Sequence, residues 1–255
     1  MNHISRSAWA CLAMSLAAFS AHAVIAPPVL TGSPLIATIN VSDALVSNFS
    51  PTRTWVQYQG NPNVIAEMAP GVGFTKVSFT GLKLSAVDIN QGTGQIQREH
   101  FDGSFYIGVM DNEFAAPMGG SIDVSNLRVD LLSKTVIANI QGINGVGRLN
   151  DVAMWRFDSV EGTTVLPRPD TFTFDSIDTK DIALSISALT FTDAGRDIWL
   201  NSLGYNTKGR ELFNAAPTFG SLSVTAVPEG ATFSMMLLGL IGLGAVARKR
   251  NLATA

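Results

Sequence analysis

Apolar and polar residues alternate with a period of two along much of the chain. Apolar residues occupy every second position from Ile182 to Ala188, which predicts a strand with one buried face. Similar runs predict strands at residues 35–41, 55–58, 76–84, 104–109, 121–131, 136–140, 171–175 and 221–225. Because Gly, Asn, Asp and Pro clusters separate these runs, the sequence predicts a mainly β fold, either an antiparallel sandwich or a partly open barrel.

Two of the predicted strands change phase in their middle. Apolar residues at 77 and 79 give way to apolar residues at 82 and 84 across Gly81, and those at 122 and 124 give way to 127 and 129. An extra residue in one strand, or a tight turn, produces such a change. We therefore expect a β-bulge or a turn at each place.

One short helix is predicted near the end of the domain, at residues 193–203. Asp193 can cap its first turn, Ile198 and Trp199 belong to a set of apolar residues at helical spacing, and Gly204 can end it. A weaker pattern allows a second short helix at residues 42–48. The simplest organisation is one β-rich domain that spans residues 24–226.

Residues 1–23 have the features of a secretory signal peptide. A polar start carrying Arg6 precedes the apolar run 8–19, and Ala21-His22-Ala23 supplies a small-x-small cleavage pattern. The apolar run is too short to span a bilayer, which takes about 20 residues. We expect export by the Sec machinery and cleavage between Ala23 and Val24.

A second apolar segment, residues 231–247, lies close to the C-terminus. It has no charged residue and is followed at once by Arg248, Lys249 and Arg250. As a helix it would be roughly 26 Å long, which is enough to cross a bilayer core. Basic residues stay on the cytoplasmic side, so residues 251–255 are predicted to be a short cytoplasmic tail and the β-rich domain is predicted to lie outside.

The residues just before this segment read Val227-Pro228-Glu229-Gly230-Ala231-Thr232. Together with the apolar segment and the basic cluster, they resemble the PEP-CTERM sorting signal, whose usual core is Val-Pro-Glu-Pro-Ala-Thr; Gly230 replaces the second proline. The resemblance covers residues 227–250 and implies processing by an exosortase in a bacterium that makes exopolysaccharide. It implies the sorting-signal residues Val227, Pro228, Glu229, Arg248, Lys249 and Arg250. The expected route is an inner-membrane-anchored intermediate, then the cell surface or the extracellular space.

Charge and cysteine content exclude several classes of function. Residues 24–226 carry 19 acidic and 13 basic residues, a net charge of −6, so no nucleic-acid partner is expected. The single cysteine, Cys11, lies in the predicted signal peptide. An exported domain would therefore contain no disulfide, no thiolate nucleophile and no cysteine-ligated metal.

Few residues offer catalytic or metal-binding chemistry. His100 is the only histidine of the domain and is predicted to lie in an exposed loop; no G-x-S-x-G pattern accompanies it. The glycine-rich segment 142–147 lacks the Lys-Ser/Thr of a phosphate loop and is interpreted as a connection between strands. Carboxylates cluster at 111–113 and at Asp170, Asp175, Asp178 and Asp181, the weak candidates for a calcium site. We expect no other cofactor.

Three segments, 120–140, 189–195 and 219–224, resemble HtaA-type β-domains of surface haem-uptake proteins. In those domains a tyrosine supported by a histidine ligates the haem iron. This chain has Tyr58, Tyr106, Tyr205 and His100, but none stands in a matching motif. The resemblance therefore implies a related fold and no particular ligand residues.

The sequence thus favours an exported, non-catalytic surface or matrix protein that associates with exopolysaccharide or biofilm. A surface protein that binds haem or a metal is the alternative. A secreted hydrolase with paired carboxylates is the second alternative, since acidic residues are numerous enough to supply such a pair. Exposed aromatic residues in a shallow groove would favour the first, a tyrosine facing an enclosed apolar pocket the second, and two facing carboxylates in a cleft the third.

Overall fold

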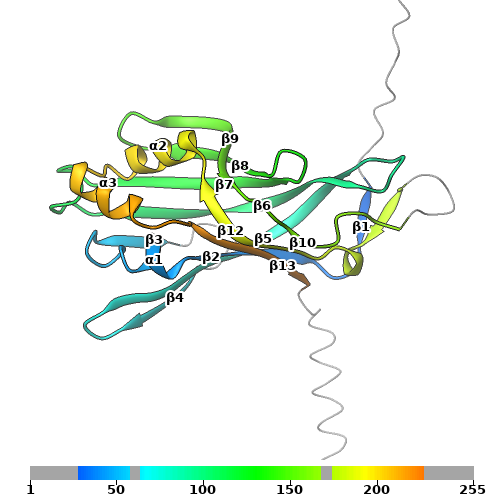
Figure 1. Ribbon diagram of the computed structural model, residues 1–255, viewed down its shortest axis with the longest axis horizontal. Coiled ribbons are helices and arrows are strands. Elements are labelled where there is room, and N and C mark those ends of the chain that lie inside the picture. Colours follow the sequence, from blue (N-terminus) through cyan, green and yellow to red (C-terminus); the bar gives the residue numbers. More distant parts are fainter. Residues whose placement is uncertain (1–27, 58–63, 168–173, 227–255) are drawn as a thin grey trace, which may run out of the picture.

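The computed structural model describes residues 28–57, 64–167 and 174–226 (Figure 1). Its strands are β1 Val29–Thr31, β2 Leu35–Val41, β3 Thr54–Gln57, β4 Val64–Ala69, β5 Gly73–Ile89, β6 Ile96–Val109, β7 Gly120–Asp130, β8 Thr135–Gly142, β9 Gly147–Arg156, β10 Glu161–Gly162, β11 Ser176–Asp178, β12 Leu184–Phe191 and β13 Gly220–Ala226. Its helices are α1 Asp43–Val46, α2 Asp193–Ser202 and α3 Thr207–Asn214, with a short 3-10 helix at Thr179–Asp181. The mainly β prediction is confirmed.

Eight of the described strands form a closed antiparallel barrel in the order β6-β7-β8-β9-β12-β13-β2-β5, and pairing between β5 and β6 closes the ring. Three strands lie beside the ring: β3 pairs with β6, β4 with β5, and β10 with β12. Strands β1 and β11 form a separate two-stranded parallel sheet. The sequence was compatible with an antiparallel sandwich or a partly open barrel. The observed strand order shows a barrel, and it is closed.

The two longest strands, β5 and β6, pair with each other over only part of their length. Residues Lys83–Ile89 of β5 face Ile96–Asp102 of β6. Beyond this stretch β5 pairs with β4, whereas β6 pairs with β3. The strands therefore separate, and the β4–β5 hairpin projects from the barrel (Figure 1).

Inward-facing apolar side chains fill the barrel, as the alternation predicts. Phe79 and Phe105 stack with ring centroids 4.1 Å apart, and Trp155 lies 4.9 Å from Phe219. Both predicted phase changes are confirmed as places where the strand register shifts or the backbone turns left-handed: φ is +80° at Gly81 and +50° at Asn126. A further shift between Ile186 and Leu189 was not predicted; it turns Ala188 outward and buries Leu189 instead.

The helix predicted at 193–203 is confirmed as α2, which packs against β7, β8 and β9 and buries Trp199. Its cap is Thr192 rather than Asp193, because the Thr192 hydroxyl accepts a 2.9 Å hydrogen bond from the backbone N–H of Gly195. The short helix expected at 42–48 is α1, capped by Ser42. The prediction of a single clear helix is wrong, since α3 follows α2.

Several predicted segments fall outside the described residues: the signal peptide, the spanning segment 231–247, the sorting signal and most of the strand at 171–175. Within the ranges that the structure describes, no helix combines the length and apolar character needed to cross a membrane. Strands β4 and β9 and the short strands β1, β10 and β11 were not predicted. In β4 the residues are mostly exposed, so no alternation of buried and exposed positions marks it.

Candidate binding groove

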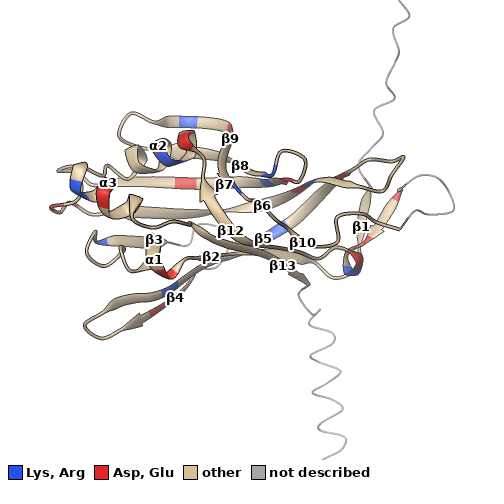
Figure 2. Cartoon of the chain, in the orientation of Figure 1, with Lys and Arg blue, Asp and Glu red and all other residues tan. Residues whose placement is uncertain are grey.

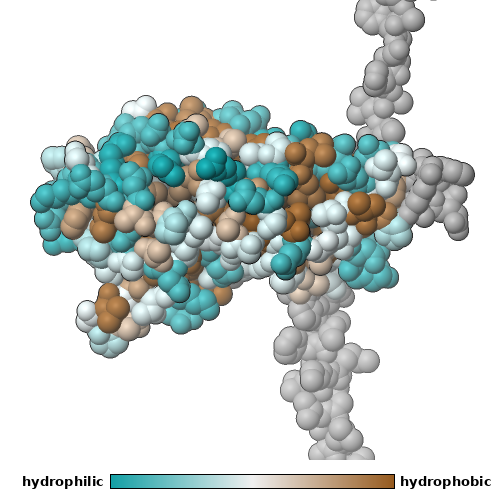
Figure 3. Space-filling view, in the orientation of Figure 1, coloured by the Kyte–Doolittle hydropathy of each residue, from teal (hydrophilic) through white to brown (hydrophobic). Residues whose placement is uncertain are grey.

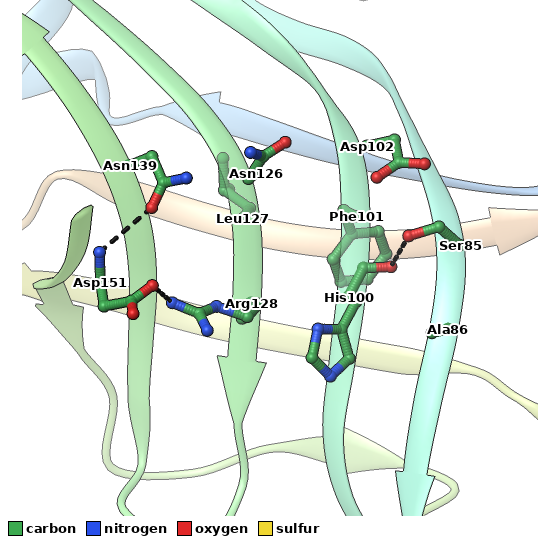
Figure 4. A pocket seen from close by; sticks show the side chains of 10 residues that line it. All are labelled: Ser85, Ala86, His100, Phe101, Asp102, Asn126, Leu127, Arg128, Asn139 and Asp151. Atoms are coloured by element: carbon green, nitrogen blue, oxygen red, sulfur yellow. Dashed lines mark hydrogen bonds and ion pairs between the residues drawn. The ribbon is translucent and has the colours of Figure 1, made fainter. Parts of the chain in front are cut away.

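A shallow polar hollow of roughly 380 Å³ lies on the outer face of the barrel, across strands β5 to β9 (Figure 4). A second hollow of roughly 210 Å³ shares Asn126 and Asn139 with the first and continues along the same strands. We call the two hollows together the polar groove. Its polar side chains are Ser85, His100, Asp102, Ser104, Asp123, Ser125, Asn126, Arg128, Asn139, Gln141, Arg148 and Asp151.

The groove follows irregularities in the barrel strands. The register of β6 and β7 shifts between Phe101 and Ser104, and that of β7 and β8 shifts between Ser125 and Arg128. Such bulges bend a strand and re-aim its side chains. Asn126, whose left-handed backbone Asn tolerates better than most residues, lies at the second shift and lines both hollows.

Three groove residues on neighbouring strands stand in a straight row, and Tyr106 on β6, beside the groove, extends that row. Tyr106 of β6 stands opposite Asp123 of β7, Asp123 stands opposite Gln141 of β8, and Gln141 stands opposite Arg148 of β9. Since neighbouring strands lie about 4.8 Å apart, the row is roughly 14 Å long. It presents an aromatic ring, a carboxylate, an amide and a guanidinium in sequence.

Trp55 of β3 extends the aromatic end of this row. Its ring centroid lies 5.1 Å from that of Tyr106, with the planes inclined by 44°. The indole lies against Gly108 on β6, where an added Cβ would collide with the ring. Both aromatic side chains are half-buried, so each is supported on one side by the sheet and reaches solvent on the other.

An ion pair and a hydrogen bond hold other side chains of the groove in place. Arg128 forms an ion pair with Asp151, and the Asn139 side-chain carbonyl accepts a 3.1 Å hydrogen bond from the backbone N–H of Asp151 (Figure 4). Partial burial raises the pKa of the Asp123 carboxyl. Several side chains of the groove are thus fixed before any ligand arrives.

His100 lies on β6 rather than in an exposed loop, so that prediction is wrong. It is half-buried, and its Nε2 lies 3.0 Å from Asp88. Arg98, two residues earlier on β6, donates a 2.7 Å hydrogen bond from Nε to the Asp130 carboxylate. This hydrogen bond raises the pKa of Arg98. Burial alone would raise the pKa of Asp130, but hydrogen bonds from Ser133 and Arg98 outweigh it and lower that pKa.

The carboxylates suggested for calcium are spread over a turn and the 3-10 helix. Asp178 caps that helix through the backbone N–H of Lys180 and pairs with the Lys180 ammonium at 2.7 Å. Asp170 lies outside the described residues. Among those that are described, no three His, Cys, Asp or Glu side chains are grouped to share a metal ion.

The other candidate residues have structural partners. Asn112 donates 2.7 Å hydrogen bonds to the carbonyls of Thr52 and Met110, which orders the loop around 111–113. Gly142 and Gly147 face each other where β8 meets β9, which confirms the glycine-rich segment as a connection between strands.

Two of the three tyrosines lie in the described residues. The Tyr205 hydroxyl lies 3.1 Å from that of Thr54 inside the core, and burial raises its pKa. Tyr106 lines the row described above, and Tyr58 is outside the described ranges. Tyr205 is therefore occupied by a structural hydrogen bond.

Comparison with known proteins gives little further guidance. No protein-family model matches the chain, and no curated protein matches it. Among solved structures, the chain is similar to the haem-binding protein HtaB from Corynebacterium glutamicum, with a TM-score of 0.44 and 10% identity over 77% of this chain and 96% of that one. The case for function therefore rests on the groove itself.

Sequence reasoning did not find the groove, although one signal was present. Outward positions of the strands at 121–131 and 136–140 hold Asp123, Ser125 and Asn139, which are short polar side chains with well-defined geometry. The alternation shows that they face outward. It does not show which strands are neighbours, so it cannot show that these side chains form one row.

Proposed function

We propose that the protein is an exported, non-catalytic surface or matrix component whose polar groove binds a neutral polysaccharide. The row of Tyr106, Asp123, Gln141 and Arg148 carries the proposal. A sugar hydroxyl both donates and accepts hydrogen bonds. The carboxylate accepts them, the guanidinium donates them, and the amide does both, so the row offers partners for successive hydroxyls.

The aromatic end fits the same class of ligand. Aromatic side chains combine a large apolar face with rigid geometry, and the apolar face of a pyranose ring can stack on such a surface. Trp55 and Tyr106 lie 5.1 Å apart at the end of the row. A polymer lying across the strands would thus meet a stacking surface and then hydrogen-bonding groups.

Charge favours a neutral polymer over an acidic one. The groove contains the carboxylates of Asp102, Asp123 and Asp151 and the guanidinium groups of Arg128 and Arg148. Arg128 is already paired with Asp151. An acidic polymer would meet at least as much negative as positive charge, and like charges across an interface reduce affinity.

The predicted ends of the chain support the location. The signal peptide with Ala21 and Ala23, and the sorting signal that begins at Val227, would deliver the domain to the envelope or beyond. Exosortase is the proposed processing partner. Exopolysaccharide is the proposed ligand, since the resemblance to the sorting signal implies a host that makes one.

The alternatives find less support in the geometry. Haem ligation would need a tyrosine that faces an enclosed apolar pocket. The Tyr205 hydroxyl is bonded to Thr54 in the core, and Tyr106 lies half-buried on the outer face of the sheet beside Trp55. A hydrolase would need a pair of carboxylates facing each other across a cleft. Of the three groove carboxylates, Asp151 is paired with Arg128. Asp102 and Asp123 lie on the neighbouring strands β6 and β7 of one sheet surface rather than on opposite walls of a cleft.

Affinity electrophoresis in gels that contain a neutral glucan, a neutral galactan or a polyuronate tests the proposal. The wild-type chain should be retarded by a neutral polymer and much less by the polyuronate. Gln141→Ala and Tyr106→Ala should each weaken the affinity measured by retardation about fivefold to tenfold, since one lost hydrogen bond or stacking contact is worth about 1–1.4 kcal/mol.

Gln97→Ala removes an amide from β6 outside the groove and serves as the matched control, which should leave retardation unchanged. Equal binding by the wild type, Gln141→Ala and Tyr106→Ala would refute the proposed site. Stronger binding to the polyuronate than to every neutral polymer would refute the proposed ligand class.

A further inference from the structure

The β4–β5 hairpin exposes an unprotected strand edge. Within the described residues β4 pairs only with β5, so one side of its backbone has no strand beside it. Ile65 and Met68 are 49% and 68% exposed, and Figure 3 shows an apolar patch on this projecting part of the molecule. Natural edge strands are usually blunted by charges, bulges or prolines.

Little of that protection is present within β4 itself, and the one irregularity of the hairpin is a shift of the β4–β5 register between Glu67 and Met68, where β5 carries the extra residue. Its only charged residue is Glu67, which forms a 3.4 Å ion pair with Lys76 on the same hairpin (Figure 2). The other five residues of the strand are apolar. A free edge of this kind is a template for pairing with another strand.

We propose that β4 pairs with β4 of a second copy of this chain and forms a symmetric antiparallel dimer. In an antiparallel pair that is related by a two-fold axis, directly opposed residues point to the same side. An axis at Ala66 places Ala66 opposite Ala66 of the second copy and Val64 opposite Met68. One side of the joined strands then carries a continuous apolar row.

The sequence around the strand favours this axis over an axis at Glu67. Pro70 stands four residues after Ala66, and proline has no N–H to donate to a strand ladder. An axis at Glu67 would bring Pro70 opposite Val64 of the second copy. The axis at Glu67 would also place two carboxylates directly opposite each other, which is unfavourable.

The axis at Ala66 avoids that repulsion. Each Glu67 would face Ile65 of the second copy, and each would keep its own Lys76. The contact is short, so the dimer should fall among the small interfaces that bury less than about 1,200 Å². It should therefore depend on concentration, and display of many copies on one surface would favour it.

A single cysteine tests the proposed register. Directly opposed residues in an antiparallel pair have Cα atoms about 4.5–5.5 Å apart, within the range of about 4.4–6.8 Å that a disulfide requires. The full-length chain with Cys11→Ala and Ala66→Cys has its only thiol at the proposed axis. Mild oxidation of the purified chain in detergent should convert most of it into a reducible dimer.

Two matched variants in the same Cys11→Ala background complete the test. Met68→Cys places the thiol opposite position 64 and should cross-link at least fivefold more slowly. Leu132→Cys places it at an exposed apolar site on the β7–β8 turn and reports random collision. Failure of Ala66→Cys to cross-link faster than Leu132→Cys would overturn the proposal. Faster cross-linking by Met68→Cys than by Ala66→Cys would overturn the register.

Discussion

Glu99 offers a sharp test of how the barrel interior is packed. Its side chain points inward from β6 between Val87 and Val129, the residues opposite it on the two neighbouring strands. Glu99 is fully buried, and its carboxyl oxygens have no hydrogen-bond partner. Burial raises its pKa to about 8, so the folded protein holds it neutral at physiological pH.

The sign of the pH effect follows from this shift. The folded chain keeps the proton of Glu99 up to about pH 8, whereas the unfolded chain releases it near the ordinary value of 4.5. The stability contributed by this group is therefore full below about pH 4.5 and is lost as the pH rises towards 8. At roughly 1.4 kcal/mol per pH unit, the loss over that window is on the order of 5 kcal/mol.

Glu99→Leu should remove this dependence and also remove a buried polar group without a partner. We expect it to raise the free energy of unfolding at pH 8 by several kcal/mol more than it does at pH 5. Urea unfolding followed by tryptophan fluorescence measures both values. Glu161→Gln, which alters an exposed carboxyl on β10, is the control and should show no such difference.

Glu99→Gln distinguishes the effect of ionising this side chain from the effect of burying any polar side chain there. It should also remove most of the pH dependence, but it should be less stable than Glu99→Leu because its amide stays buried without partners. If the wild type and both Glu99 variants lost stability equally between pH 5 and pH 8, the account of a neutral buried carboxyl would be wrong.

Two further predictions concern the core and the ends of the chain. Trp199 is fully buried among aromatic rings and lies 5.3 Å from Phe219, so Trp199→Ala should lower the free energy of unfolding by about 3–5 kcal/mol. Leu132→Ala, at an exposed site, should change it by less than about 0.5 kcal/mol, and a loss below about 1 kcal/mol for Trp199→Ala would show that the ring is not packed as described. For sorting, replacement of Pro228 and Glu229 by alanine should leave membrane insertion intact and block removal of the tail. Immunoblots of membrane and medium fractions with and without the exosortase would show this, and a tail that stays attached in the wild type of both hosts would contradict the sorting signal.

The sequence predicted much of the barrel because alternation reports burial directly. Strand β2 was predicted to the residue, at 35–41, since every second side chain there enters the core. Glu99 shows the limit. It stands in a polar stretch of the sequence, and only the strand pairing turns it inward beside Phe101.

Helix α3 and the groove were missed for different reasons. Residues 207–214 contain Gly209 and few apolar residues, so the segment offers little apolar surface that would mark it as part of the fold, and tertiary packing of Phe213 stabilises the helix. The row from Tyr106 to Arg148 depends on which strands are neighbours and in what register. No local pattern contains that information.

The most direct test of the central claim is a nuclear magnetic resonance titration of the isotopically labelled domain with an oligosaccharide of the neutral polymer that retards it most. Because the proposed ligand lies across the strands, the amide shifts should concentrate at Tyr106, Asp123, Gln141 and Arg148 and at the side-chain amide of Asn126. They should saturate together with one dissociation constant. Shifts confined to other faces of the barrel, or no shifts at saturating oligosaccharide, would contradict the proposal that this groove binds a polysaccharide.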